Sequence, residues 1–339
     1  MFLSVASASK ERAGAVLPLE PSEDKRHLLG QILVQEHRDL GYGPDEDNSL
    51  CVTVAPAAGT PFSRSAVLQI LGADWMRACG GPELFGLPSS ASSWTYLRAG
   101  GAPEEYSALK VAWPLSASYR PDWQVPSMET LQRYRRDFDD KLPLIRGVTV
   151  GESMTVARAA YRAREIASLK ETCDRTAVII LAADEGRPFS GRTIWDTMLC
   201  LGLSWGDMDL FHWENRSTSV GDDHHFSVWT TTPPGYFFPE EIAADRVVVR
   251  DLVLGFRIPR CAAPIEVFHA MLASAEYAKQ RLGGQLRNGD DQPLDRDAAL
   301  KEIASVVGEL CAKGFVPGAS GVEDRLKLTQ GNRLKLTHP

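Results

Sequence analysis

Four adjacent residues, Asp222-Asp223-His224-His225, are the first candidates for chemistry, because their side chains bind metals or carry protons. Four consecutive residues of an extended loop cannot all face one ion. No H-E-x-x-H segment elsewhere in the chain would complete a metal site. We therefore interpret the run as a solvated turn between two strands and expect no metal.

Other sequence patterns that enzymes use are also missing. The run Ala99-Gly-Gly-Ala102 lacks the glycine spacing of phosphate-binding loops, and no G-x-S-x-G nucleophile elbow occurs. Cys200 falls on the apolar stripe of a predicted helix, where a nucleophile would be inaccessible. Asp184-Glu185 precede a helix start, where the helix dipole favours negative charge. We predict no enzymatic activity and no cofactor.

The composition is that of a globular protein long enough for two domains. The 339 residues are 44% hydrophobic and carry a formal net charge of −7, which disfavours binding along nucleic acid or an anionic membrane. Six cysteines without a C-x-x-C pair favour a reduced cytoplasmic protein over a secreted disulfide protein. No apolar run approaches the ~20 residues of a membrane-spanning helix, and the N-terminus lacks the features of a signal peptide.

One pattern of short motifs occurs twice along the chain. An apolar run is followed by Pro-Phe-Ser, a helical stretch and then Leu-Phe, with offsets of 127 residues at Pro-Phe-Ser and 126 at Leu-Phe. In both copies the serine is placed to cap a helix. The pattern predicts two related domains, of which the first is degenerate. The motifs are Cys51–Val54, Pro61–Ser63 and Glu83–Phe85 in the first copy, and Ala177–Leu181, Pro188–Ser190 and Asp209–Phe211 in the second.

The second copy has clear signals for strands and helices. Strands are predicted at 226–231, 247–258 and 285–287. One helix should run from Pro264 to Gly283-Gly284, and another should begin at Asp295 or Asp297. The order predicts an α+β fold, a two-layer antiparallel sheet with helices on one face. The expected domains are a polar tail or linker (1–48), the degenerate copy (49–173), the complete copy (174–313) and a disordered tail (314–339).

Three segments of the second copy carry a family resemblance. Gly206-Asp-Met-Asp-Leu-Phe-His212, followed by Phe226-Ser-Val-Trp229 and Pro234-Gly-Tyr-Phe-Phe-Pro239, resembles the C-terminal domain of the bacterial cell-division protein family ZipA. That resemblance implies a split β-α-β fold whose sheet has one open face. It also implies a partner, the C-terminal tail of the tubulin-like protein FtsZ.

The resemblance places this tail across four apolar positions, Val178, Ile180, Met208 and Leu210. In a two-layer domain the sheet face away from the helices meets water or a partner. Both side-chain sets of the strand at 177–181 are apolar, which is typical of a binding surface. Alternatively, Val178 and Ile180 pack against the first copy and form an interdomain interface.

Three further positions depart from the family pattern. Thr231 replaces a methionine, Pro233 a lysine and Gly255 a phenylalanine, which removes two large apolar contacts and one positive charge. Trp229 has the same parity as Thr231 along the strand, so it is expected to refill part of the groove with aromatic area.

RNA binding is the alternative function. A split β-α-β sheet with exposed aromatics such as Trp229, Phe211 and Trp213 can stack bases. The acidic balance and the lack of an RNP1-like segment oppose it, so no nucleic acid is expected. RNA binding would need the three arginines at 250, 257 and 260 to form a basic strip beside these aromatics.

The expected cellular location depends on whether the sequence contains a membrane-spanning helix. ZipA-family proteins are anchored by an N-terminal membrane helix, and this sequence shows none. We expect a cytoplasmic protein that reaches the division site through its partner. If the start lies downstream of a lost anchor, it would act at the cytoplasmic face of the inner membrane.

Overall fold

The computed structural model describes residues 5–32, 43–116, 124–216, 221–319 and 322. The chain divides into two compact units. The first unit contains residues 38–171. The second unit contains residues 172–322 together with the N-terminal segment before residue 38. Both are α+β with antiparallel sheets, as the sequence predicts.

The first unit is built on a mixed-length antiparallel sheet with strand order β4-β3-β5-β1-β6. Its helix α2 begins at an N-cap serine, Ser63, whose side chain accepts a hydrogen bond from the backbone N–H of Ala66, as expected. Its strands are β1 (Ser49–Pro56), β2 (Phe62–Ser63), β3 (Glu83–Pro88), β4 (Thr95–Tyr96), β5 (Glu105–Pro114) and β6 (Gly147–Glu152). Its helices are α2 (Arg64–Ile70), α3 (Ala73–Ala78), α4 (Met128–Asp139) and α5 (Val156–Cys173), the last of which runs into the second unit.

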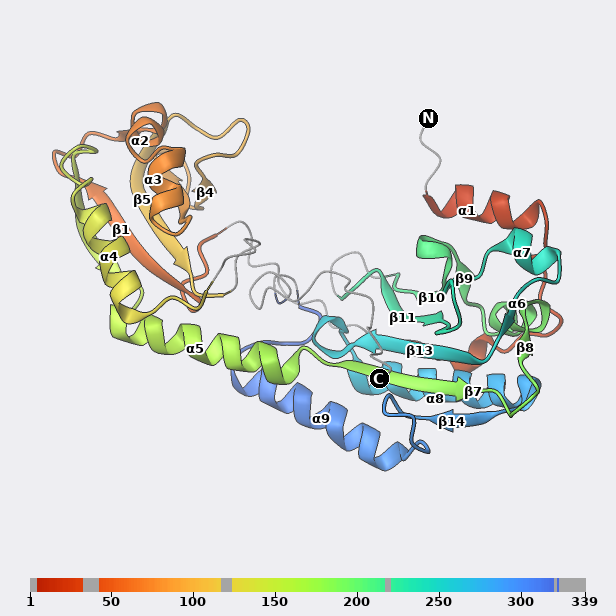
Figure 1. Ribbon diagram of the computed structural model, residues 1–339. Coiled ribbons are helices and arrows are strands. Elements are labelled where there is room, and N and C mark those ends of the chain that lie inside the picture. The colour runs from red at the N-terminus through yellow and green to blue at the C-terminus, as the bar shows by residue number, and fades with distance from the viewer. Residues whose placement is uncertain (1–4, 33–42, 117–123, 217–220, 320–321, 323–339) are drawn as a thin grey trace. The chain divides into compact units, whose positions relative to one another are not determined.

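The second unit has a six-stranded antiparallel sheet in the order β14-β7-β13-β11-β10-β9, and β8 pairs separately with β12. Helix α8 contacts the sheet strands along one face (Figure 1), and α6 and α9 pack on α8. Its strands are β7 (Thr176–Ala182), β8 (Phe189–Ser190), β9 (Ser204–Trp205), β10 (Phe211–Glu214), β11 (His224–Trp229), β12 (Val248–Val249), β13 (Asp251–Arg257) and β14 (Gln285–Arg287). Its helices are α1 (Val5–Gly14), α6 (Gly191–Cys200), α7 (Pro239–Ala243), α8 (Pro264–Leu282) and α9 (Arg296–Ala312), with 3-10 turns η1 (Arg26–Leu28), η2 (Asp207–Asp209) and η3 (Ile258–Arg260).

Both units contain a split β-α-β element. In the second unit, β13 continues through α8 into β14, and β7 lies between these two strands and runs antiparallel to both. In the first unit, β5, α4 and β6 are arranged in the same way around β1. The shared strand order is consistent with the predicted internal repeat, which stays a prediction.

The starts and ends of three helices can be compared with the capping signals in the sequence. Helix α8 begins at Pro264 and ends before Gly283 and Gly284, both with positive φ, which glycine tolerates best. Helix α9 is capped by Asp295, whose carboxylate accepts a hydrogen bond from the N–H of Ala298. Ser190 stands at the N-cap of α6 but makes no side-chain cap bond there, contrary to expectation.

The N-terminal segment, expected as a polar tail or linker, packs against the second unit. Leu17 and Leu29 are buried, and the indole N–H of Trp195 donates to the carbonyl of Pro18 at 2.9 Å. Tyr277 donates to Glu23 at 2.7 Å. Within this segment the described residues form α1 and the 3-10 turn η1, and residues 33–42 lie outside the described part. The expected tail at 314–339 lies outside it beyond residue 322.

Among the described residues, no helix combines the length and the apolarity that crossing a bilayer requires.

Candidate functional site: an open sheet face with a groove

The pleat divides the second unit's sheet into a core face and an open face. One row of residues paired across β7, β13, β11 and β10 is fully buried toward the helices. This core row consists of Ile179, Leu254, Val228 and Phe211. The neighbouring row, on the other face, consists of Val178, Gly255, Ser227 and His212. Strand residues alternate between faces, so Ile180, Val253 and Trp229 also belong to this open face.

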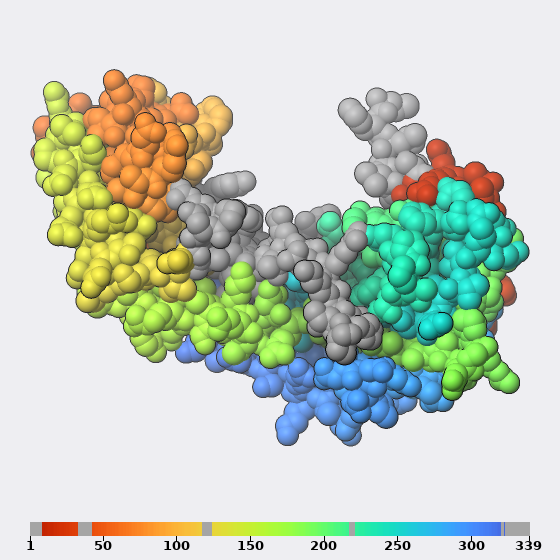
Figure 2. Space-filling view, in the orientation of Figure 1, coloured from red at the N-terminus to blue at the C-terminus, as the bar shows by residue number. Residues whose placement is uncertain are grey.

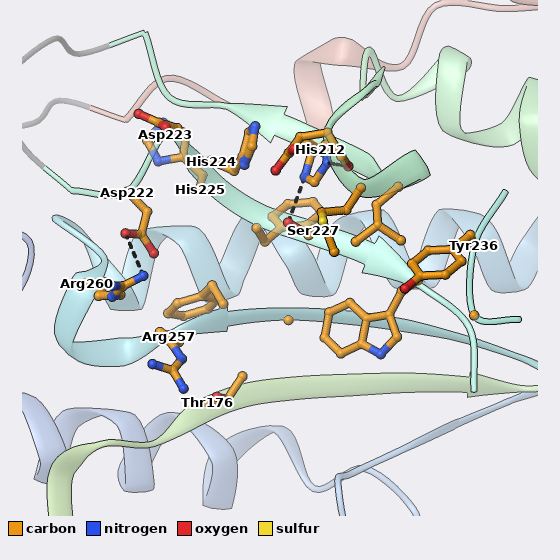
Figure 3. A pocket seen from close by; sticks show the side chains of 18 of the residues that line it. Thr176, His212, Asp222, Asp223, His224, His225, Ser227, Tyr236, Arg257 and Arg260 are labelled. Carbon is orange, nitrogen blue, oxygen red and sulfur yellow. Dashed lines mark hydrogen bonds and ion pairs between the residues drawn. The ribbon is translucent and has the colours of Figure 1, made fainter. Parts of the chain in front are cut away.

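A groove with a cavity of about 650 Å³ lies on this face (Figure 3). Its walls come from η2, β10, β11, β13 and the loop after β11. Tyr236 lies at one end and Asp222 and Arg260 at the other. Of the eight predicted site residues, the groove lining includes Met208, Leu210, Trp229, Thr231 and Gly255 and does not include Val178, Ile180 or Pro233.

Met208 and Leu210 enter the groove from a turn that precedes β10. Met208 and Asp209 both have left-handed φ values, 57° and 56°, and Met208 is 53% exposed. The turn is closed by the N–H of Gly206, which donates to the carbonyl of Leu210 at 3.0 Å. β10 starts only at Phe211. The turn therefore presents one large apolar side chain to solvent beside a second, half-buried one.

Trp229 covers the position where the family pattern has a phenylalanine. A Cβ added to Gly255 would lie 2.8 Å from Cη2 of Trp229, closer than real Cβ contacts. The indole therefore occupies space that a side chain at position 255 would need. That Trp229 replaces the missing phenylalanine in binding a ligand stays a prediction.

The other two departing positions have different surroundings. The backbone N–H of Thr231 donates to the Asp251 carboxylate at 2.7 Å, and its hydroxyl bonds to the same carboxylate. Pro233 is exposed and lies just before Pro234, which does line the groove. Thr231 therefore fixes the groove wall to β13.

Ile180 is only 8% exposed, so its contribution to a ligand surface is small. The interdomain-interface interpretation of Val178 and Ile180 stays a prediction.

Histidines form the middle of the groove floor. Nε2 of His212 lies 2.8 Å from the carbonyl oxygen of Asp207, so this nitrogen donates. Its Nδ1 then accepts from the hydroxyl of Ser227, also at 2.8 Å. His224 stacks on His212 with ring centroids 3.9 Å apart. Burial lowers the pKa of both rings, and the neighbouring charge of His224 lowers the pKa of His212 further. Both rings are therefore neutral near pH 7, and the two hydrogen bonds of His212 join the η2 turn to β11.

The remaining candidates of the acidic-histidine run do not converge on one point. Asp222 pairs with Arg260 at 3.5 Å, and burial raises the pKa of Asp222. His225 is buried with its ring centroid 4.4 Å from that of Trp213, and burial lowers its pKa to about 4. Asp223 is exposed. Within the described ranges, no group of three or more His, Cys, Asp or Glu side chains is placed to hold a metal ion.

The arginines beside the groove do not form the basic strip that RNA binding would need. Arg257 pairs with Asp174 at 3.7 Å, and Arg260 pairs with Asp222. Arg250 does not line the groove. Of the aromatics proposed for base stacking, Phe211 is fully buried in the core, so that expectation was wrong for this residue.

A protein-family model matches the part of the chain that contains this groove. Residues 175–304 match the family model described as ZipA, C-terminal FtsZ-binding domain. The predicted resemblance is confirmed. The match runs from β7 into the first half of α9, and so it includes every residue of the open face named above. We call this part of the second unit the ZipA-like domain.

Curated relatives carry the name cell division protein ZipA. The chain is 30% identical over 112 residues to the protein from Shewanella loihica, matching 33% of this chain and 32% of the relative. To the protein from Shewanella frigidimarina it is 30% identical over 138 residues, which are 40% of this chain and 38% of the relative. To the protein from Azotobacter vinelandii it is 28% identical over 200 residues, covering 54% of this chain and 68% of the relative. The chain thus spans about a third of the length of the two Shewanella relatives.

Ser227, Tyr236 and Arg257 are among the lining residues that the sequence interpretation did not assign to the peptide groove. Tyr236 stands in the Pro-Gly-Tyr-Phe-Phe-Pro motif that carried the resemblance, so a signal for it existed. Ser227 shares the parity of Trp229 in β11 and could have been found by the same alternation. Arg257 required the register of β13 on β7, which no local pattern specifies.

Proposed function

We propose that this protein is a non-enzymatic cell-division component that binds the C-terminal tail peptide of FtsZ. The observation that carries the proposal is the groove on the open face of the ZipA-like domain, where Met208, Leu210 and Trp229 line a cavity of about 650 Å³. Large apolar side chains exposed together in a groove commonly mark a partner site. By this function the protein supports assembly of the division ring.

The proposed ligand is an amphipathic peptide with apolar side chains. Met208 is unbranched and polarisable, so it adapts to several apolar ligands, and Trp229 offers a large flat contact. Gly255 and Thr231 make the groove differ from the family pattern, with Trp229 supplying the compensating area. We expect a micromolar Kd, because ordering a disordered tail costs about 2–5 kcal/mol of the gross interaction energy.

We further propose that the protein reaches the division site through FtsZ. The chain spans only part of its relatives, so recruitment is best tested in cells. A fluorescent fusion should form a ring with wild-type FtsZ and lose it when the FtsZ tail is deleted.

The deciding experiment is a calorimetric titration of the full chain with the synthetic C-terminal tail of an FtsZ. A scrambled peptide and an RNA oligonucleotide serve as controls. Saturable binding of the tail alone is expected. Absence of binding by the tail would overturn the proposal, and saturable RNA binding would favour the RNA-binding alternative.

A further inference from the structure

Helix α1 lies outside the segment that matches the ZipA domain, yet it packs on that domain. It contacts α7, β9 and η2, and Figure 2 shows the red atoms of the N-terminal segment directly against teal atoms of the second unit. Two of these contacts, α7 and η2, flank the groove: η2 presents Met208, and α7 begins three residues after Tyr236.

One side chain of α1 joins both elements. Nε and Nη2 of Arg12 donate to the two carboxylate oxygens of Glu240 at 2.8 and 3.0 Å. Nη1 of the same guanidinium donates to Oδ1 of Asp209 at 2.8 Å. The guanidinium also lies 5.3 Å from the ring centroid of Trp205 in β9. The planar fork of arginine suits such simultaneous contacts, and a lysine would not reproduce them.

Asp209 is the point where this contact reaches the groove. It follows Met208, and both residues have left-handed φ values, a conformation that non-glycine residues keep only where their surroundings hold it. The carbonyl of Asp209 accepts from the N–H of Phe237 at 2.9 Å, next to Tyr236. Asp209 therefore connects the turn that presents Met208, the loop that presents Tyr236 and the N-terminal helix.

We propose that Arg12 is a positioning residue for the peptide groove: by bridging Asp209 and Glu240 it holds the Met208 turn and the Tyr236 wall in the binding arrangement. The inference rests on the proposed function, since it assigns the N-terminal segment a part in the same site. It also explains why α1 is docked on the side of the domain that borders η2 and α7. Peptide affinity should then depend on residues more than 160 positions before the family segment.

The test uses the full chain with Arg12→Ala, Asp209→Asn and the double variant. Asparagine tolerates the left-handed conformation, so Asp209→Asn removes the charge and keeps the turn. The matched control is Arg246→Ala, which breaks a bidentate pair of the same kind with Glu241 at 2.6 Å, outside the groove lining. Each variant is titrated with the FtsZ tail peptide, and the methyl resonance of Met208 is recorded by NMR in the free protein.

Arg12→Ala and Asp209→Asn should each lower the affinity for the peptide by roughly fivefold, about 1 kcal/mol. The double variant should bind the peptide no more weakly than either single variant. The Met208 methyl should shift in these variants and stay unchanged in Arg246→Ala. An unchanged methyl and unchanged affinity in Arg12→Ala would overturn the inference. So would losses that simply multiply in the double variant. If the wild type binds no peptide, the proposed function fails, and the methyl resonance alone still decides the role of Arg12.

Discussion

In the first unit, the face that corresponds to the groove is filled by the unit's own side chains. When Cys51–Val54 is aligned with Val178–Leu181, strand pairing places Lys110 and Phe85 where the second unit has Val253 and Trp229. The Leu-Phe motif of the predicted repeat would instead match Phe85 with Phe211, so the motif and the sheet register disagree at this strand. Trp94 and Tyr96 pack against Phe85, with the Phe85 and Tyr96 ring centroids 5.8 Å apart.

A buried cation completes this cover. Nζ of Lys110 lies 4.4 Å from the ring centroid of Trp94 and pairs with Glu46. In the second unit the same face carries Trp229, but beside it an open cavity lined by Met208 and Leu210. The two sheets share a split β-α-β element, but the first unit covers this face with its own side chains and the second unit leaves a cavity on it. The comparison predicts peptide binding in the second unit only.

The largest expected effect comes from placing a charge in the groove. Leu210→Asp should weaken the FtsZ tail at least ~100-fold, about 2.7 kcal/mol, because an apolar ligand would bury an unpaired carboxylate. Val248→Asp, at a 52% exposed position of β12 away from the groove, is the control and should bind normally. Calorimetry of both folded variants measures this, and equal affinities would break the comparison. Val178→Glu, also expected to abolish binding, tests whether the ligand extends beyond the lined cavity.

Acid should destabilise the second unit selectively. The first unit, residues 38–171, contains no histidine. In the second unit His225 has a pKa of about 4, and the pKa values of His212 and His224 are also lowered by burial. The unfolded chain therefore binds more protons below pH ~6.5, so stability is lost as pH falls from there toward about 4.

The loss in the second unit should be about 2 kcal/mol at pH 5, from the His225 shift. Hydrogen exchange read by mass spectrometry at pH 7 and pH 5, corrected for intrinsic rates, resolves the two units. His225→Gln should reduce the effect. Equal acid loss in both units would contradict the assignment to these histidines.

Removing the first unit's cover should expose its sheet face. Trp94→Ala should destabilise that unit by about 2 kcal/mol, less than a fully buried tryptophan would cost, because Trp94 is only partly buried. Denaturant unfolding with a hydrophobic dye gives the readout. Affinity for the FtsZ tail should not change. A gain of peptide binding by the first unit would instead show that the cover alone separates the two faces.

The smallest effect tests the exchange between Trp229 and Gly255. Gly255→Phe should weaken the tail by about fivefold, roughly 1 kcal/mol, because the added ring displaces the indole. Combining it with Trp229→Ala should restore most of the affinity. If the double variant is weaker than both single variants, the two positions do not substitute for each other.

The sequence predicted elements whose signals are local. Helices α8 and α9 were foreseen because Pro264, the glycines after Leu282 and the cap at Asp295 act within one turn. The strand expected over 247–258 is instead divided into β12 and β13, since β12 pairs with β8 in a separate sheet. The choice of partner strand depends on tertiary structure and leaves no local trace.

The site was predicted in its residue types and less well in its geometry. The alternation Asp207-Met-Asp-Leu imitates a strand, but the left-handed turn at Met208 is held by contacts from distant segments. The same reason explains why the packing of α1 on the second unit was not predicted from the sequence. Arg12 of this helix has side-chain partners that lie 197 and 228 residues away in the chain.

The second unit is assembled from two stretches of chain that flank the first unit in the sequence. During synthesis, α1 leaves the ribosome before any of its contacts exist. About 190 residues follow before Asp209 is made, which at 5–20 residues per second is roughly 10–40 s. The N-terminal helix therefore waits unpartnered while the first unit folds, and a fragment that begins at residue 174 would be made without it.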